Sequence, residues 1–460
     1  IALPLVGLLI PNQLFPLSGI TVIEQRVVAI FLFAALSWIL EPIPIYTTSL
    51  AIILLELIML SNKSLVLFKS TDVRYGTELA YNDILHTFAS PIIILFLGGF
   101  FLAMAATKYR LDQNLARVLL SPFGKKPKFL MLGIMIITAV FSMFMSNTAT
   151  TAMMLSILAP VLPLLETNDK GKIGLLLSVP VAANIGGIGT PIGTPPNAVA
   201  LKYLTGSSAI SFGEWMSFAV PYVVVLMAIA WFVLVWIFPA KTAGIELNVK
   251  GKFLKNKKAY VVYGTFVLTI ALWLTDFIHG MNAYIVALIP VTVFSITGII
   301  NKADLQRVSW DVLWLVSGGI ALGFALDQTG LANRLISSIS FENLSPIIII
   351  GAASILAAVM ANFMSNTATA NLLLPLMAVI GVNVASLSEY GGAQMIVLVT
   401  TIACSMGMAL PISTPPNALA FGTGLLTTKE MAKPGIIIAV VGLVLSYGLI
   451  AILQVSGFFK

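Results

Sequence analysis

The chain has 460 residues, of which 59% are hydrophobic and only 9% are charged, and its mean hydropathy is +1.02. Because so few charges cannot cover the surface of a water-soluble domain, the composition excludes a soluble protein and indicates an integral membrane protein. The formal net charge of +7 predicts basic loops on the cytoplasmic side of a membrane rather than a nucleic-acid partner.

Apolar stretches of roughly the 20 residues that cross a bilayer recur along the chain, among them Val220 to Pro239, Ala259 to Thr275 and Pro434 to Val455. They are continuous and rich in Leu, Ile, Ala and Met, whereas barrel strands would alternate polar and apolar residues. The first residues, IALPLVGLLIPNQLF, lack the basic start of a signal peptide. We predict an all-α, polytopic, multi-pass protein of the cell membrane with about eleven transmembrane helices, a cytoplasmic N-terminus and an external C-terminus.

Three blocks of sequence occur twice in the same order, with about 220 residues between the members of each pair. The pairs are Phe96 to Arg117 with Leu315 to Arg334, MSNTATTAMM at Met145 with MSNTATANLL at Met364, and IGTPPNAVA at Ile192 with ISTPPNALA at Ile412. Three ordered matches at one offset indicate an internal duplication, which is typical of two-half transporters.

Lysine placement predicts that the two halves have opposite orientations. The first MSNTAT segment lies between the basic stretches GKKPK and NDKGK, whereas residues 335–428, around the second copy, contain no lysine or arginine. Basic loops stay in the cytoplasm, so matching segments end on opposite sides. We predict a single transporter unit over residues 1–460, with residues 26–240 as the first inverted repeat, 241–258 as a cytoplasmic linker and 259–460 as the second repeat.

Polar runs interrupt the apolar segments at matching places. Phe129 to Glu166 would be about 57 Å long as one helix, too long for one crossing, and its SNTAT run divides it. Two geometries fit: two full helices joined by a solvated turn, or two short helices that re-enter from one side. Because TPPN also breaks a long segment in each half, and paired breaks mark transporter binding sites, we predict two re-entrant hairpins whose tips converge with the TPPN breaks.

The tips Ser146–Thr148 and Ser365–Thr367 predict an anion site without a charged side chain. Their hydroxyls and amides can cap the following half-helix and leave backbone N–H groups aimed at the ligand. Helix dipoles then attract a carboxylate without the cost of burying a cation in the membrane. Two facing tips favour a dicarboxylate, while a monocarboxylate, phosphate or sulfate remains an alternative.

The TPPN runs predict a cation site. Proline cannot continue a helix that arrives from before it, so the preceding half-helix leaves carbonyls free near Gly193 and Ser413. Such carbonyls suit a bare monovalent cation. The alternative is that each proline pair only kinks a membrane helix.

With both motifs duplicated and glycine-rich helices upstream, the chain resembles the divalent anion/sodium symporter family, the INDY-type transporters, from about Phe33 to its end. The resemblance implies a homodimer that carries C4 or C5 dicarboxylates (succinate, malate, fumarate, 2-oxoglutarate) or citrate by an elevator-type movement of a transport domain. It implies substrate contacts at Ser146, Asn147, Thr148, Ser365, Asn366 and Thr367, with Thr194, Pro195, Thr414 and Pro415 nearby.

The resemblance also implies two sodium sites in those members that couple transport to sodium. The first would comprise Ser142, Ser146, Asn147 and Gly193, and the second Ala361, Met364, Asn366 and Ser413. Sodium-coupled relatives have a hydroxyl where this chain has Ala361, so one oxygen ligand is missing. The family also includes sodium-independent exchangers. We therefore predict a dicarboxylate exchanger, with a sodium-coupled dicarboxylate or citrate symporter as the alternative and no cofactor other than Na⁺.

Other classes are less favoured. The single cysteine, Cys404, allows no internal disulfide, and His86 and His279 are too far apart in sequence to indicate a zinc or haem site. Asp276 and His279 could share a helix face, but no nucleophile stands beside them, so we predict no enzyme. An anion channel is an alternative, because re-entrant hairpins also build selectivity filters.

Three acidic residues, Glu56, Asp311 and Asp327, stand alone in or near apolar segments. We interpret them as polar groups between helices or at segment ends.

Overall fold

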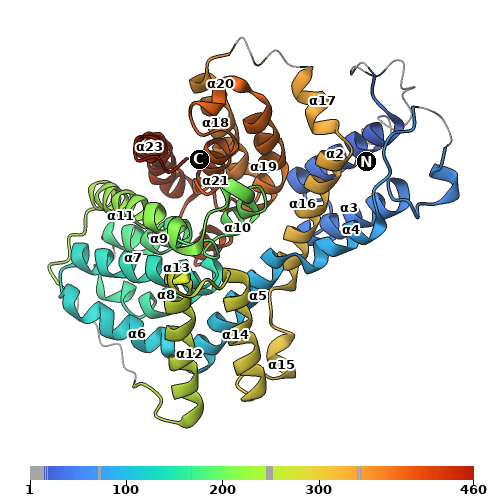
Figure 1. The fold of residues 1–460 in the computed structure, drawn as a ribbon. Helices are drawn as coiled ribbons and strands as arrows, with labels where there is room; N and C mark the ends of the chain where they lie inside the picture. Colours follow the sequence, from blue (N-terminus) through green and yellow to red (C-terminus); the bar gives the residue numbers. More distant parts are fainter. Residues whose placement is uncertain are drawn as a thin grey trace.

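Figure 1 shows a computed structural model of the chain, which describes residues 15, 17, 19–70, 74–166, 168–244, 252–338, 341 and 344–459. Within these ranges the regular secondary structure is helical apart from one isolated bridge between Ser61 and Leu79.

The α-helices of the first half are α2 (Val22–Leu40), α3 (Ile45–Met59), α4 (Tyr81–His86), α5 (Pro91–Lys108), α6 (Leu111–Leu120), α7 (Pro127–Phe144), α8 (Asn147–Leu158), α9 (Gly171–Gly187), α10 (Pro195–Leu201) and α11 (Phe212–Ile237). Those of the second half are α12 (Lys257–Leu274), α13 (Asp276–His279), α14 (Ala283–Ile296), α15 (Lys302–Leu305), α16 (Trp310–Gln328), α17 (Leu331–Ser337), α18 (Pro346–Phe363), α19 (Asn366–Asn383), α20 (Ala385–Ser388), α21 (Gly392–Cys404), α22 (Pro415–Phe421) and α23 (Thr428–Val455).

The helices confirm an all-α polytopic membrane protein. In the described part of the chain, 9 helical segments are long and apolar enough to cross a membrane, and shorter apolar helices lie at Ile45–Met59, Gly171–Gly187, Ala283–Ile296 and Gly392–Cys404. α9 and α10 together would form one crossing, and so would α21 and α22. Counted in this way, the helices account for the predicted crossings after residue 20. The remaining predicted crossing falls on residues 1–20, most of which lie outside the described residues, as do residues 245–251 of the predicted linker.

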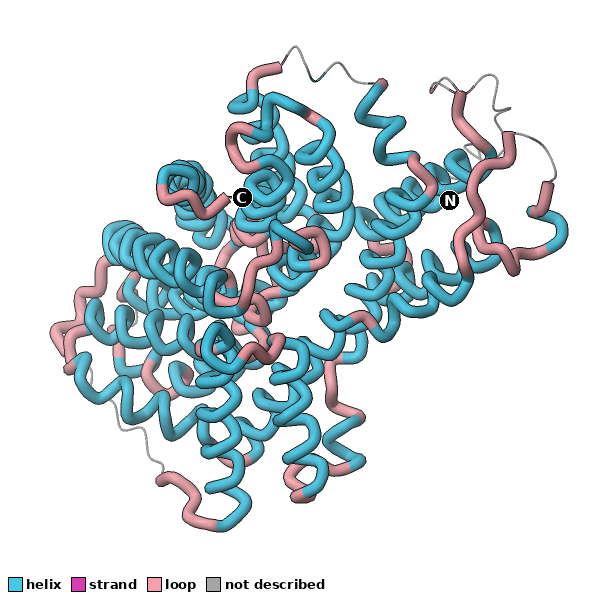
Figure 2. The backbone as a smooth tube through the Cα atoms, in the orientation of Figure 1, coloured by secondary structure: helices cyan, strands magenta, loops and turns pink. Residues whose placement is uncertain are grey.

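All four polar motifs break helices, as the sequence predicts. α7 ends at Phe144 because Met145 and Ser146 are extended, and α18 ends at Phe363 with the same geometry at Met364 and Ser365. The TPPN motifs place proline at the first position of α10 and of α22, where its missing N–H costs nothing. Figure 2 shows the resulting non-helical backbone gathered in the middle of the molecule.

The short helices after TPPN are exchanged between the halves. α10 packs against α19 and α21, whereas α22 packs against α8 and α9. Asn184 of α9 strengthens this contact, because its Nδ2 donates to Thr414 Oγ1 and to Asn417 Oδ1, each at 3.2 Å. This reciprocal packing is the arrangement that two repeats related by a pseudo-twofold axis would produce.

Several loops and helix ends, two of them at the ends of the predicted linker, are joined by hydrogen bonds. Lys258 Nζ donates to the Gly298 carbonyl at 3.1 Å, and Lys108 Nζ donates to the Ile299 carbonyl at 2.8 Å. Asp169 accepts hydrogen bonds from the backbone N–H and the hydroxyl of Thr242, which follows the C-terminal end of α11. Burial alone would raise the pKa of Asp169, but these bonds and those from two further backbone N–H groups hold it below its usual value.

Candidate functional site

The first hairpin tip is a helix N-terminus with an ordered asparagine. Ser146 caps α8 by accepting a hydrogen bond from Ala149 N at 3.2 Å. Asn147 is half-buried, and its Oδ1 lies 2.5 Å from the Ser142 hydroxyl, which also lies 2.7 Å from the Ala183 carbonyl. The single Ser142 hydroxyl proton is thus shared between two acceptors, Asn147 Oδ1 and the Ala183 carbonyl. This contact connects α7, α8 and α9.

The second tip repeats the cap but not the asparagine contact. Ser365 accepts from Ala368 N at 3.2 Å. The residue that corresponds to Ser142 is Ala361, which has no hydroxyl, and Asn366 Oδ1 is buried without a hydrogen-bond partner among the described residues. An unsatisfied buried oxygen is costly unless a ligand or ion approaches it.

The residues of the first predicted sodium site lie together. A Cβ at Gly187 would lie 2.8 Å from Asn147 Oδ1 and 3.0 Å from the Gly193 carbonyl oxygen. Since Ser142 contacts the same Asn147 oxygen, three of the four predicted residues surround one point, with Ser146 next to Asn147 in sequence. Their oxygens are neutral and hard, which suits Na⁺.

Two residues of the second predicted sodium site lie near one another, because Ser413 contacts Asn362, the residue that follows Ala361. A Cβ at Gly407 would lie 2.2 Å from the Ala361 carbonyl oxygen, and Ser413 Oγ donates to the Asn362 carbonyl at 2.9 Å. Met364, also buried, follows α18 directly. An ion here would depend on backbone carbonyls and Asn366 Oδ1, because Ala361 contributes no hydroxyl.

The TPPN loops differ from the expectation of free carbonyls. Asn197 Nδ2 lies within 3.1 Å of the carbonyls of Gly187, Ile188 and Thr190. Asn417 Nδ2 likewise donates to two carbonyls of its own loop, both at 2.9 Å. Carbonyls at the end of α9, and carbonyls in the loop after α21, therefore accept hydrogen bonds from the asparagine of the following motif. Sequence reasoning missed this role, although both motif copies contain the asparagine.

The remaining predicted contact residues differ in exposure. Thr148 is exposed, whereas Thr367 is buried, as are Thr194 and Thr414. The two prolines, Pro195 and Pro415, are half-buried and exposed respectively. Thr414 is engaged already, because its Oγ1 accepts from Asn184 Nδ2 and from Asn417 N.

A cavity of about 360 Å³ adjoins the first tip and contains charged side chains. Its lining residues are Phe100, Ala103, Met104, Thr107, Lys108, Ser146, Ala149, Asp304, Arg307, Val308 and Ser309. Sequence reasoning missed these charged neighbours of the tip: Lys108 comes from α5, Asp304 from α15 and Arg307 from the loop before α16, all far from Ser146 in sequence.

The charges in this cavity leave one basic group in excess. Lys108 and Asp304 form an ion pair at 2.5 Å. Burial raises the pKa of Asp304, but the hydrogen bond from Lys108, the backbone of Asn301 and the charges of Lys108 and Arg307 outweigh this effect and lower it. Asp304 is therefore ionised at neutral pH and balances Lys108. Arg307, which is exposed, makes the cavity attractive to anions.

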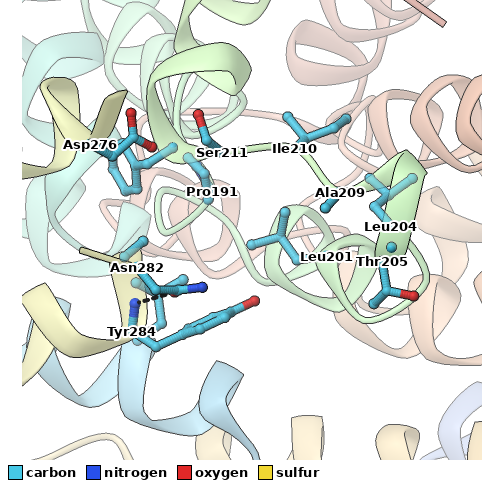
Figure 3. A pocket seen from close by; sticks show the side chains of 14 residues that line it. Pro191, Leu201, Leu204, Thr205, Ala209, Ile210, Ser211, Asp276, Asn282 and Tyr284 are labelled. Atoms are coloured by element: carbon cyan, nitrogen blue, oxygen red, sulfur yellow. Dashed lines mark hydrogen bonds between the residues drawn. The ribbon is translucent and has the colours of Figure 1, made fainter. Parts of the chain in front are cut away.

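A second cavity, of about 280 Å³, lies apart from both tips (Figure 3). It is largely apolar and is lined from α10, α11 and the start of α14, and Pro191 brings the loop before α10 to its edge. Asn282 there caps α14 by accepting from Tyr284 N at 3.0 Å. Neither SNT motif lines this cavity, so we do not assign the anion to it.

Asp276 and His279, next to this second cavity, make local contacts. His279 Nε2 lies 2.8 Å from the Leu272 carbonyl, and its Nδ1 accepts from Met281 N at 3.0 Å. Asp276 Oδ1 accepts from the next backbone N–H. Within the described ranges no group of three or more His, Cys, Asp or Glu side chains is placed to hold a metal ion. These contacts favour a structural role for the pair.

Comparison with known proteins identifies similar transporters. The model of a family described as the sodium:sulfate symporter transmembrane region matches residues 1–454. The sodium-dependent dicarboxylate transporter SdcS of Staphylococcus saprophyticus is 32% identical in an alignment 481 residues long. The alignment covers 94% of this chain and 88% of SdcS. The Staphylococcus aureus SdcS (strain NCTC 8325) is also 32% identical, with 94% and 87% covered.

Two solved structures share the fold. The Alcanivorax borkumensis YdaH transporter has a TM-score of 0.54 and 11% identity, and the match covers 91% of this chain and 99% of that one. Neisseria gonorrhoeae MtrF, an antimetabolite efflux pump, has a TM-score of 0.54 and 13% identity, with 92% and 97% covered. At such low identity these matches bear on the fold alone.

Proposed function

The chain belongs to the divalent anion/sodium symporter family, and from this we propose that it is a secondary transporter of C4 and C5 dicarboxylates such as succinate, malate, fumarate and 2-oxoglutarate. The family comprises membrane transporters, which confirms the predictions of a transporter rather than an enzyme and of a multi-pass protein in the cell membrane.

The observation that carries the proposal is the pair of capped helix N-termini. α8 and α19 begin at equivalent motifs, each with a serine cap at 3.2 Å and an asparagine at the first helical position. A helix N-terminus binds an anion through backbone N–H groups and its dipole. The exchanged packing of α10 and α22 supports a common pseudo-twofold site, in which each tip would bind one carboxylate of the substrate.

The neutral donor set supports Na⁺ as a second substrate. Ser142, Asn147 and the Gly193 carbonyl would hold one ion, and Asn366 with the carbonyls near Ala361 would hold another. A bound Na⁺ would supply positive charge directly beside the carboxylates, in addition to the basic side chains of Lys108 and Arg307 in the cavity next to the first tip. Asn366 Oδ1, which lacks a partner among the described residues, is the atom that would gain most from such an ion.

We propose sodium symport as the first candidate for coupling and anion exchange as the second. The named relatives are sodium-dependent, and the first cation site has every expected side chain. Exchange is favoured by Ala361, because the lost hydroxyl weakens the second site. An exchanger needs no co-ion to return, since its loaded form moves in both directions.

The mechanism that we propose is an elevator in a homodimer. α2, α3 and α16 pack on one another, as do α5, α12 and α14. The hairpins pack with α9, α11, α21 and α23, and α19 also packs against α16, where the two parts would meet. This grouping supports a fixed part made of the first two sets and a moving part that contains the hairpins. Alternating access would then carry the site past the fixed helices.

Reconstitution into proteoliposomes tests the function and its coupling. Labelled succinate uptake that saturates and depends on sodium, even into vesicles with no internal dicarboxylate, supports symport. Uptake that is unchanged when choline replaces sodium, but requires internal dicarboxylate, supports exchange. Flux that does not saturate and shows no trans-stimulation would reject a carrier and favour a channel. Saturable transport of a different anion with no succinate uptake would reject the substrate class.

A further inference from the structure

A fully buried carboxylate lies outside the candidate site. The Glu56 side chain, in α3, is 0% exposed, and neither of its carboxylate oxygens has a hydrogen-bond partner in the described part of the chain. A carboxylate that water and donors do not reach requires a nearby positive charge or a proton. The interpretation of Glu56 as a polar group between helices or at a segment end therefore does not account for its full burial without a partner in the described part of the chain.

The nearby positive charge is Lys202, which directly follows α10. Its Nζ donates to the Ile320 carbonyl in α16 and lies 5.4 Å from the centre of the Tyr203 ring. The ammonium attracts the carboxylates of both Glu56 and Asp327. One lysine thus connects α10, which follows a TPPN motif, with the packed pair α3 and α16.

The backbone of α16 leaves room for this contact. A Cβ at Gly323 would lie 2.2 Å from the Tyr203 hydroxyl and 3.3 Å from Lys202 Nζ. The absence of a side chain at Gly323 therefore gives both groups room to pass close to α16. Lys202, Tyr203 and Asp327 also line a cavity of about 420 Å³, and Asp327 is exposed there. Glu56 itself does not line this cavity, whereas Lys202, whose charge acts on it, does.

Other charged groups on the helices packed against α3 do not compensate Glu56. They are Glu24 and Arg26 on α2, Asp83 and His86 on α4, and Asp311 and Asp327 on α16. Glu24 pairs with Arg334 at 2.8 Å, and Arg26 donates to the carbonyls of Met59 and Phe68. Among the described residues, Lys202 is the charged group that acts on Glu56.

We propose that Glu56 is a proton-binding site of this transporter and that the position of Lys202 decides whether the site is occupied. The inference rests on the proposed function: α10 packs against α19 and α21 and would go with the part proposed to move, whereas α3 and α16 belong to the part proposed to stay. When Lys202 is beside Glu56, the ammonium compensates the carboxylate. When α10 moves away, the carboxylate takes one proton from water and becomes neutral. Movement of the site is thereby linked to pH.

Infrared spectroscopy of the purified wild-type protein tests the site without any transport assay. A protonated carboxyl without a hydrogen-bond partner absorbs at the high-frequency end of the carboxylic acid region, and we expect such a band in a pH titration. It should be absent in Glu56→Gln and unchanged in Glu389→Gln, whose side chain is exposed. In Lys202→Met the band should persist to higher pH, because the compensating charge is gone. A wild-type titration without the band, or a band that Glu56→Gln retains, overturns the proposal.

The pH profile of succinate uptake separates this inference from the proposed function. Wild type and Glu389→Gln should share one profile from mildly acidic to mildly alkaline pH, whereas Glu56→Gln should keep saturable uptake and lose most of the pH dependence that remains after correction for substrate ionisation. Coincident profiles for all three would refute the proton site while leaving the transporter intact. Absence of dicarboxylate uptake by the wild type would instead refute the function. If Glu56→Gln does not elute as a folded species, the wild-type and Lys202→Met infrared titrations decide.

Discussion

The two hairpin tips have the same MSNTAT sequence but different surroundings. At both tips a serine caps the next helix at the same distance. At the first tip the Ser142 hydroxyl lies 2.5 Å from Asn147 Oδ1, whereas at the second Ala361 offers no hydroxyl and Asn366 Oδ1 stays without a partner among the described residues. A duplicated motif therefore preserves backbone geometry, while the chemistry of each tip depends on residues of neighbouring helices.

The largest expected effect tests what the tips share. Asn147→Ala and Asn366→Ala should each reduce labelled succinate uptake in proteoliposomes by roughly 10- to 100-fold or more, because each removes a polar group from a buried site. Size-exclusion chromatography should show an unchanged oligomer. If both variants retained wild-type dicarboxylate affinity, the tips would not be the binding site.

Glycine substitutions sharpen the contrast between the tips. A Cβ at Gly407 meets the Ala361 backbone oxygen at 2.2 Å, whereas a Cβ at Gly187 meets the Asn147 side chain at 2.8 Å. Gly407→Ala should therefore destabilise the protein by about 1–3 kcal/mol. Gly187→Ala should keep more of its stability but lose uptake, because Asn147 is displaced. Thermal unfolding in detergent, together with uptake rates, measures both. Equal losses of stability would show that the two glycines have equivalent surroundings.

Ser142 and Ala361 occupy equivalent positions, so exchanging their residue types should give each tip the properties of the other. Ala361→Ser supplies a donor for Asn366 Oδ1 and should add about 1 kcal/mol of stability and steepen the sodium dependence of uptake. Ser142→Ala should have the opposite effect on both measurements, since Asn147 and the Ala183 carbonyl lose a donor. Sodium titrations of both variants check this. An unchanged sodium response in each would remove these positions from cation binding.

The smallest effect concerns the charged side chains in the cavity next to the first tip. The pKa of Asp304 is lowered, so the Lys108–Asp304 pair stabilises the fold above the ordinary aspartate pKa, and this contribution is lost only as pH falls through the lowered value. Asp304→Asn should cost at most about 1 kcal/mol at neutral pH and less in strong acid. Thermal midpoints measured against pH test this, and a cost that grows on acidification would contradict it.

The sequence by itself determined the class of protein and where its helices break. Apolar stretches predicted the membrane helices, and the breaks at Ser146, Ser365, Thr194 and Thr414 lie where the motifs place them. These features are readable because capping serines and prolines act on backbone groups within about four residues of themselves.

Only the tertiary structure decided which side chains meet. It brought Asn184 to Thr414, and Lys108 with Asp304 to the cavity beside Ser146. It also placed Lys202 where its charge reaches Glu56, a residue that looked isolated in the sequence. Contacts of this kind depend on how helices pack across the whole chain, and neither hydropathy nor local capping contains that information.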